Sequence, residues 1–243
     1  MKFGYFLQVF VIIQHYAYCI AVVYLCDRNA ICGCSNSDAN LGRIIGGENA
    51  IQSSWGWMVS LQRILGESFC GGTIVSPSMI ITAAHCVAQY PQINPSLYVV
   101  AGIDKPSESN SLRAQVRSVS RIFIHQDYVR QMFLNDIAVL QLDEPLLISY
   151  GMRTSQICLP TAELNISAIL GSLENSSFVA IGWGTINSTL QFVSPTLHLQ
   201  QVTLDGIAST HPMCSQVITN NRTQFCAGIL GGGKGKIDDV EYF

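Results

Sequence analysis

The stretch FCGGTIVSPSMIITAAHC, from Phe69 to Cys86, is the most informative part of the sequence. Two cysteines bracket two β-branched and apolar runs, and a Ser-Pro-Ser turn separates these runs. The second run leads directly into Ala-Ala-His, which places a histidine at His85. A neutral imidazole held beside a disulfide can serve as a general base at physiological pH. His85 is therefore a candidate catalytic base.

The rest of the chain has short β-branched and apolar runs at turn-like spacing, separated by Gly, Pro, Asn and Ser. A long helix-period stretch is missing, and we expect only single helical turns at 83–89 and near 207–217. The pattern predicts an all-β protein built from barrels or a sandwich. The expected strands are 58–61, 73–75, 79–82, 97–101, 119–124, 137–142, 178–181 and 197–204.

The first 25 residues form two apolar runs joined by Gln14 and His15. They are typical of a signal peptide, with cleavage after Ala17 or Ala21. The alternative is a membrane anchor over residues 3–25, which would place several polar side chains at membrane depth at a cost in free energy. We expect a signal peptide over residues 1–21 and a secreted, extracellular protein.

Nine cysteines in a chain of the oxidising secretory route favour disulfides over metal binding. The CxC pair of Cys32 and Cys34 has no matching histidine cluster nearby, so it too favours disulfides. Cleavage after Ala21 removes Cys19 and leaves an even number, and parity therefore favours that cleavage site. Four N-x-[ST] sequons fit a secreted chain and are expected glycosylation sites: Asn165, Asn175, Asn187 and Asn221.

Charge and composition exclude some classes of partner. The formal net charge is −3 and only 12% of residues are charged, so no basic stripe is present to neutralise phosphates. We expect no nucleic-acid partner. Residues 27–42 contain few large apolar side chains and many Asn, Ser, Asp and Gly, which predicts an exposed linker.

The pentapeptide TAAHC, which ends at Cys86, resembles the histidine signature of the chymotrypsin and trypsin family of serine proteases. Arg43 followed by IIGGENA resembles the activation junction of that family, and NDIAVL from Asn135 to Leu140 resembles its aspartate motif. Further landmarks follow in family order: SWGWMVSL at 54–61, ICLP at 157–160, IGWG at 181–184 and FCAG at 225–228. The resemblance implies two antiparallel β-barrels and a serine endopeptidase.

The resemblance also implies roles for individual residues. His85 would be the general base, and Asp136 the buried carboxylate that orients it. A zymogen would be cut between Arg43 and Ile44 by a trypsin-like activating protease, and the partners would be polypeptide substrates or protease inhibitors, with no cofactor or metal. The alternative is a secreted non-catalytic homologue that binds or competes with partners, but the presence of both His85 and Asp136 argues against it.

The resemblance assigns disulfides as well. It pairs Cys70 with Cys86 and Cys214 with Cys226. It leaves Cys158 to tether either Cys32 or Cys34, and the remaining cysteine of that CxC pair would then bond with Cys26. The resemblance leaves open which of the two takes which partner.

The family pattern breaks close to residue 235. Gly232, Gly233 and Lys234 keep the family register, but residues 235–243 read GKIDDVEYF, and no serine follows Ser215. Ser215 adjoins Cys214 in a segment that we expect to be structural. The nucleophile, the oxyanion-hole amides and most of the specificity pocket are therefore expected to lie outside these residues, which predicts no peptide hydrolysis by the chain as written and an incomplete second barrel.

The codons of Gly235 and Lys236 can read GGTAAG, which contains GTAAG, a typical intron start. We therefore expect residues 235–243 to come from a retained intron or an incomplete gene model rather than from a true truncation. A spliced protein could carry aspartate at position 235 and cleave after Arg or Lys. The expected domains are a signal peptide (1–21), a pro-segment with cysteines (22–43), a first barrel (44–160) and a partial second barrel (161–243).

Overall fold

The computed structural model describes residues 22–24, 27, 29–41, 47–148, 152–160, 176–184, 198–220 and 223–228. Regular structure within them is almost entirely β, as predicted, with one α-helical turn, α1 (Ala84–Val87), and one 3-10 helix, η1 (Pro106–Asn110). The strands are β1 (Val22–Tyr24), β2 (Ala39–Leu41), β3 (Glu48–Asn49), β4 (Met58–Gln62), β5 (Ser68–Ser76), β6 (Met79–Thr82), β7 (Tyr98–Ala101), β8 (Gln115–Ile124), β9 (Ala138–Leu142), β10 (Ser177–Gly182), β11 (Gln200–Ile207) and β12 (Cys226–Gly228).

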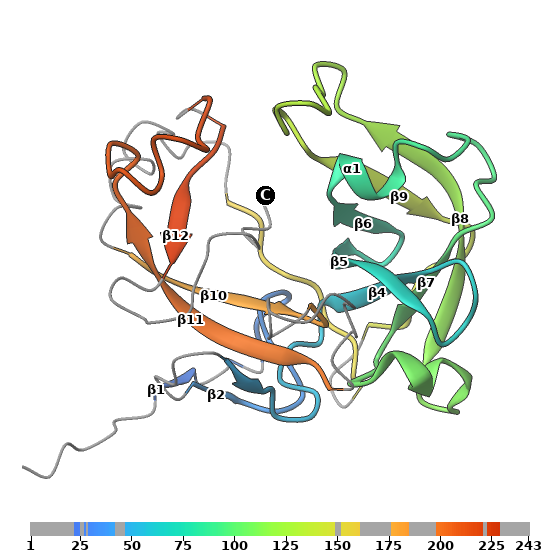
Figure 1. Cartoon of the computed structure of the whole chain (residues 1–243). Coiled ribbons are helices and arrows are strands. Elements are labelled where there is room, and N and C mark those ends of the chain that lie inside the picture. The colour runs from blue at the N-terminus through green and yellow to red at the C-terminus, as the bar shows by residue number, and fades with distance from the viewer. Residues whose placement is uncertain are drawn as a thin grey trace, which may run out of the picture.

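Six strands close into an antiparallel barrel in the order β4-β5-β6-β9-β8-β7 (Figure 1). Strand β9 shows why these runs form strands: Ala138, Leu140 and Leu142 are buried, whereas the residues between them are half-buried. Strand β4 is buried at every position, because one face points into the barrel and Met58 on its other face packs against the second unit. The sequence left barrel and sandwich open, and the structure has the barrel.

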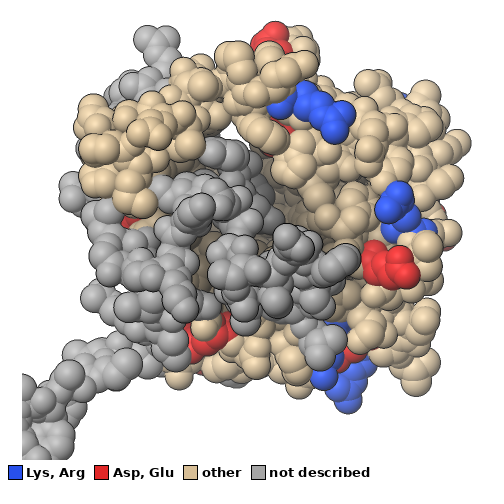
Figure 2. Space-filling model, in the orientation of Figure 1, with Lys and Arg blue, Asp and Glu red and all other residues tan. Residues whose placement is uncertain are grey.

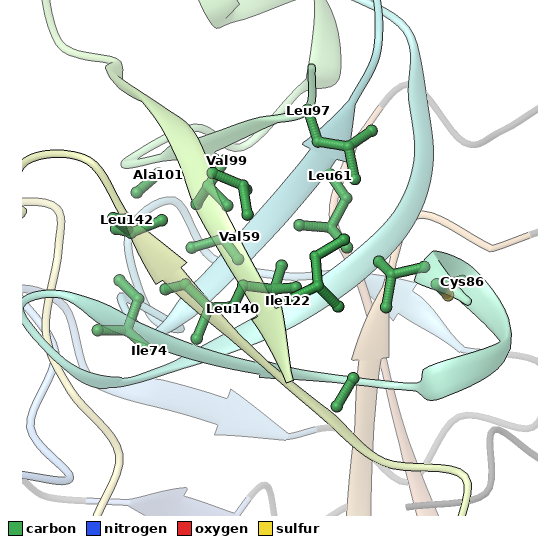
Figure 3. Close-up of a cluster of buried hydrophobic side chains, with 14 of the residues drawn as sticks. Val59, Leu61, Ile74, Cys86, Leu97, Val99, Ala101, Ile122, Leu140 and Leu142 are labelled. Carbon is green, nitrogen blue, oxygen red and sulfur yellow. The ribbon is translucent and has the colours of Figure 1, made fainter. Parts of the chain in front are cut away.

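The barrel interior is filled by aliphatic side chains contributed by all six strands (Figure 3). Leu61, Ile74, Ile80 and Leu140 are fully buried. Burying a side chain of this size contributes about 1.5–3 kcal/mol to the free energy of unfolding. The buried side chains therefore make the barrel a stable support for the residues that it carries.

Gly72 of β5 marks the tightest point of this core. A Cβ atom added there would lie 2.8 Å from Ile80 Cγ2 and 3.2 Å from Val59 Cγ2. We expect Gly72→Ala to lower the free energy of unfolding by about 1–3 kcal/mol, measured by urea denaturation, because these neighbours must shift. Gly184→Ala is the matched control, since its added Cβ would meet no atom of the described residues within 4 Å. Equal stability of the two variants would contradict this packing.

The second unit is an open sheet in the order β10-β11-β12, with β3 paired on β11. Residues Glu48 and Asn49 pair with Gln201 and Gln200, so the chain enters the second sheet before it builds the first barrel. Strand β3 thus lies within residues 44–160, which we expected to form the first barrel, but it pairs with the second sheet. An all-β fold with one closed barrel and a partial second sheet confirms the predicted fold class.

The two units pack against each other through a shared apolar cluster. Met58 and Val100 of the barrel contact Trp183 and Leu199 of the second unit. Asp104 reinforces the contact, because its carbonyl accepts hydrogen bonds from Trp183 Nε1 (3.1 Å) and from the Leu199 amide (2.8 Å). Segments distant in sequence are thereby held together at one junction.

Two sequence-based expectations differ from the structure. The exposed linker predicted over residues 27–42 is wrong for β2, where Ala39 is 6% exposed and Leu41 is 3% exposed. This segment is polar overall, but the two apolar side chains of β2 are buried where β2 meets β11. The helical turn expected near 207–217 begins later, because Ile207 still belongs to β11. Single turns with i to i−4 hydrogen bonds follow, from the Ser215 amide to the His211 carbonyl (2.9 Å) and from the Ile218 amide to the Cys214 carbonyl (2.9 Å). No described helix has the length and apolar character needed to cross a bilayer.

Candidate active site

His85 sits in the short helix α1, directly after β6. The preceding Ala83 is extended, which turns the chain out of the sheet before the helix begins. Thr82 Oγ1 donates a hydrogen bond to the Gly71 carbonyl (2.7 Å), and the Cys70–Cys86 disulfide ties the helix to β5. The main chain that carries His85 is therefore held on both sides by the barrel.

Asp136 lies just before β9, in a loop that needs unusual backbone angles. Asn135 adopts a positive φ of 53°, which asparagine tolerates better than most residues. Its side-chain amide donates to the Asp127 carbonyl (2.9 Å), and its own carbonyl accepts from the Ile137 amide (2.8 Å). The motif residue Asn135 thus shapes the turn that presents the Asp136 carboxylate.

The two side chains meet as a hydrogen-bonded pair. His85 Nδ1 lies 2.7 Å from Asp136 Oδ2, and the His85 backbone amide donates to Asp136 Oδ1 at 2.7 Å. The Asp136 side chain is 2% exposed, whereas that of His85 is 41% exposed. An ionised carboxylate only accepts hydrogen bonds, so Nδ1 must carry the proton and Nε2 is left as the acceptor. This arrangement can take a proton from a hydroxyl that approaches Nε2.

Phe133 forms one wall beside the imidazole. Its ring meets the His85 ring edge to face, with centroids 5.9 Å apart and an interplanar angle of 86°. Gln224, which is 5% exposed and lies beside β12, donates from Nε2 to the Phe133 carbonyl at 3.4 Å. The second unit therefore contacts the loop that flanks the histidine. We did not single out Phe133 or Gln224 from the sequence, and only the closeness of Phe133 to Asp136 could have drawn attention to it.

Tyr128 lies in the same loop as Phe133. Its hydroxyl is buried and makes no hydrogen bond with any described residue. Burial raises the pKa of Tyr128, the charge of Asp136 raises it further, and Arg130 lowers it in part. The pKa of Tyr128 is therefore higher in the folded state than in the unfolded state. The stability that this group contributes is fully present below the unfolded-state pKa of about 10, and it is lost as the pH rises through the folded-state pKa.

We expect Tyr128→Phe to leave the free energy of unfolding at pH 7 unchanged or to raise it by up to about 1 kcal/mol, because an unpaired buried hydroxyl is removed. Above pH 10 the variant should lose less stability than the wild-type chain, since one group that titrates differently in the two states is gone. Urea denaturation at pH 7 and pH 10.5 measures both effects. A variant that is clearly less stable at pH 7 would show that the hydroxyl makes a favourable contact.

A metal site at His85 is disfavoured by the state of its neighbours. Within the described part of the chain, potential metal-ligand atoms lie close together in one group, formed by Cys70, His85 and Cys86. Both sulfurs are bonded to each other, and zinc binds thiolates rather than disulfide sulfurs. His85 Nε2 also lies 3.5 Å from Cys86 Sγ, so the disulfide packs beside the ring instead of sharing an ion with it.

A buried carboxylate that holds a histidine base, on a closed barrel packed against a second sheet, is the geometry expected for a serine protease. The sequence model of the trypsin family matches residues 44–237. The chain belongs to the trypsin family. The match begins at Ile44, the first residue after the predicted activation junction, and contains both His85 and Asp136.

Relatives in this family cover most of the chain. Ovochymase of Halocynthia roretzi is 33% identical over 203 residues, which are 82% of this chain and 12% of that protein. Transmembrane protease serine 11G of Rattus norvegicus is 31% identical over 217 residues, 88% of this chain and 46% of that protein. Chymotrypsin-C of Mus musculus is 30% identical over 222 residues, 86% of this chain and 74% of that protein. The chain thus spans less than half of the first two relatives.

The structure contains three described disulfides: Cys32–Cys158, Cys70–Cys86 and Cys214–Cys226. Between the two alternatives for Cys158, it contains the bond with Cys32, and Cys34 is disulfide-bonded as well. The prediction of a disulfide-bonded, trypsin-like protein is therefore confirmed. Charged side chains lie scattered over the face seen in Figure 2, without a basic stripe among its described residues.

Several predicted residues lie outside the described part of the chain. They are the residues of the signal peptide, the junction of Arg43 and Ile44, Cys26, the register residues Gly232 to Lys234 and the asparagines of the four sequons. Ser215, the last serine of the sequence, is described and contacts the Pro212 carbonyl through Oγ at 3.5 Å. It lies in the loop closed by Cys214 and Cys226, so its surroundings are those of a turn.

Proposed function

We propose that these residues supply the first barrel and the base of a secreted trypsin-like serine endopeptidase that is made as a zymogen. The observation that carries the proposal is the 2.7 Å contact between His85 Nδ1 and the buried Asp136 carboxylate. A carboxylate without water around it fixes the imidazole tautomer, and an exposed ring edge keeps Nε2 reachable. Membership of the trypsin family supports the same reaction.

The mechanism needs a serine hydroxyl, which we expect from the segment that follows Lys234 in the complete protein. His85 would accept the hydroxyl proton at Nε2 while the serine oxygen bonds to the scissile carbonyl carbon. Asp136 would stabilise the imidazolium that forms, and His85 would then pass the same proton to the leaving amine. The residues present here accept, hold and return one proton, and they provide no attacking group in the family register.

Activation and export complete the proposal. Cleavage between Arg43 and Ile44 by a trypsin-like protease would create a new amino terminus, and the Cys32–Cys158 disulfide would keep the pro-segment attached after the cut. A signal peptide over residues 1–21 would direct the chain to the secretory route, where its disulfides form. Polypeptides and protease inhibitors are the proposed partners.

The origin of residues 235–243 can be tested on nucleic acid. We expect genomic DNA to read GTAAG across codons 235 and 236, and a downstream exon to encode Gly-Asp-Ser-Gly-Gly. Sequencing of the gene and of its spliced transcripts measures both. Absence of either feature would contradict the retained-intron proposal.

A further inference from the structure

A short hairpin precedes the activation junction and lies below the second sheet in Figure 1. Strand β1 pairs antiparallel with β2, with Val22 opposite Leu41, Val23 opposite Asn40 and Tyr24 opposite Ala39. Strand β2 ends at Leu41, two residues before Arg43. The pairing thus engages the residues that directly precede the bond to be cut.

The other edge of β2 is also engaged, through one buried side chain. Gln201 of β11 is 1% exposed, and its Nε2 donates to the Asn40 carbonyl at 2.7 Å. The same amide nitrogen donates to Glu48 Oε1 (3.0 Å), while its oxygen accepts from Trp55 Nε1 (2.8 Å). Gln201 therefore holds residues on both sides of the Arg43–Ile44 junction.

This contact decides which backbone groups face β1. The amide and carbonyl of one residue point to the same side of a strand, so Asn40 faces Gln201. Its neighbours Ala39 and Leu41 must direct their backbone groups towards β1. The hydrogen-bonded pairs are therefore Tyr24 with Ala39 and Val22 with Leu41, whereas Val23 and Asn40 form the pair without hydrogen bonds.

The pro-segment upstream of β2 is fixed to the body at several points, so the hairpin has a stable base. The Cys32–Cys158 disulfide is accompanied by hydrogen bonds from the Gly33 amide to the Gln156 carbonyl (2.8 Å) and from the Ser37 amide to the Ser53 carbonyl (3.2 Å). Ser35 Oγ accepts from the Gly56 amide at 2.9 Å. Strand β2 must therefore be released by local opening of its pairing, while the segment upstream of it stays attached.

A protease binds its substrate as an extended strand and pairs with the substrate backbone. Residues 39–41 already use their backbone groups on both edges, and the Ala39 and Leu41 side chains are buried. We propose that the β1–β2 hairpin is a latch that shields the activation junction, so that an activating protease cuts after Arg43 only when the hairpin opens. This inference rests on the proposed activation at Arg43, which it extends to the control of that cleavage.

The test is the rate at which trypsin produces the amino terminus Ile-Ile-Gly-Gly from the folded 243-residue chain, followed by mass spectrometry and amino-terminal sequencing. Tyr24→Pro removes an amide that bonds to Ala39 and should speed this cleavage about fivefold, the effect of one lost hydrogen bond on an opening equilibrium. Val23→Pro is the matched control, because its amide points away from β2. Tyr24→Ala keeps the amide and controls for the lost side chain.

Gln201→Met gives a second readout, because it keeps the length of the side chain and removes its hydrogen bonds to both sides of the junction. We expect it also to speed cleavage by about fivefold or more. Equal rates for Tyr24→Pro, Gln201→Met and the wild-type chain would overturn the latch while leaving cleavage at Arg43 intact. If no variant is cut after Arg43 even when its disulfides are reduced, the proposed activation site is wrong. The latch proposal, which depends on that site, is then wrong as well.

Discussion

Asp136→Asn is expected to lower kcat/KM by about 10⁴ in the complete enzyme, in which the spliced continuation after Lys234 supplies aspartate at position 235 and then Gly-Asp-Ser-Gly-Gly-Pro, a magnitude taken from the family and not from this chain. Asparagine can place its amide against His85 Nδ1, where the Asp136 carboxylate now accepts a hydrogen bond. The proton would then sit on Nε2, which could no longer act as the base. Hydrolysis of a peptide amide substrate with Arg or Lys before the scissile bond measures the loss.

The matched control for this change is Asp143→Asn. Asp143 is exposed and accepts a hydrogen bond from the neighbouring Glu144 amide, so asparagine should replace it without effect on hydrolysis. Asp136→Asn should also keep the hydrogen bond from the His85 amide to its side-chain oxygen, and therefore the fold. A loss of less than about tenfold would contradict the orienting role of Asp136.

Leu140→Ala is expected to lower the free energy of unfolding by about 2–5 kcal/mol, measured by urea denaturation of the disulfide-intact chain. Leu140 of β9 is fully buried in the barrel and is drawn among its packed neighbours in Figure 3. Truncation removes apolar contacts and leaves a cavity that a closed barrel cannot easily collapse. Because the barrel carries both His85 and Asp136, the same variant should lose the geometry of the pair at lower temperature.

Leu112→Ala is the control for the loss of a leucine as such. Its side chain is fully exposed, so removing it should change stability by less than about 0.5 kcal/mol. Similar losses for Leu112→Ala and Leu140→Ala would mean that the barrel interior is not the stabilising core.

The first barrel and the paired residues were predictable because their signals are local. Alternating apolar residues in β9 and the turn residues between the strands indicate β-structure directly, and all eight predicted strands overlap observed ones. His85 and Asp136 stand in short motifs whose residues also build the local backbone, as Asn135 does. Their closeness in space then followed from the family resemblance rather than from spacing.

The features that we missed depend on contacts between distant residues. Gln201 reads as one polar residue in a strand, but it contacts Asn40, 161 positions earlier in the chain. Strand β2 lies in a segment that is polar overall, yet its Ala39 and Leu41 side chains are buried where β2 meets β11. Gln224 reaches Phe133 across 91 positions. No local sequence pattern predicts such contacts, since each partner is an ordinary residue within its own segment.

The two glutamines show how the second sheet serves the first barrel. Gln224 contacts the loop beside His85, and Gln201 holds the segments around the activation junction. Both are almost fully buried, so loss of either would leave polar partners without a hydrogen bond at a cost in stability. The second unit therefore supports both the loop beside His85 and the segments on either side of the proposed activation junction.

The most direct test of the account is labelling by an active-site phosphonate probe after cleavage at Arg43. We expect no labelling of the 243-residue chain, because it presents His85 and Asp136 without a serine in the family register. The chain extended after Lys234 with the complete spliced continuation, which contains Gly-Asp-Ser-Gly-Gly-Pro, should be labelled at the new serine, and His85→Ala should abolish that labelling. Labelling of the 243 residues themselves, or labelling of the extended chain that does not need His85, would contradict the account.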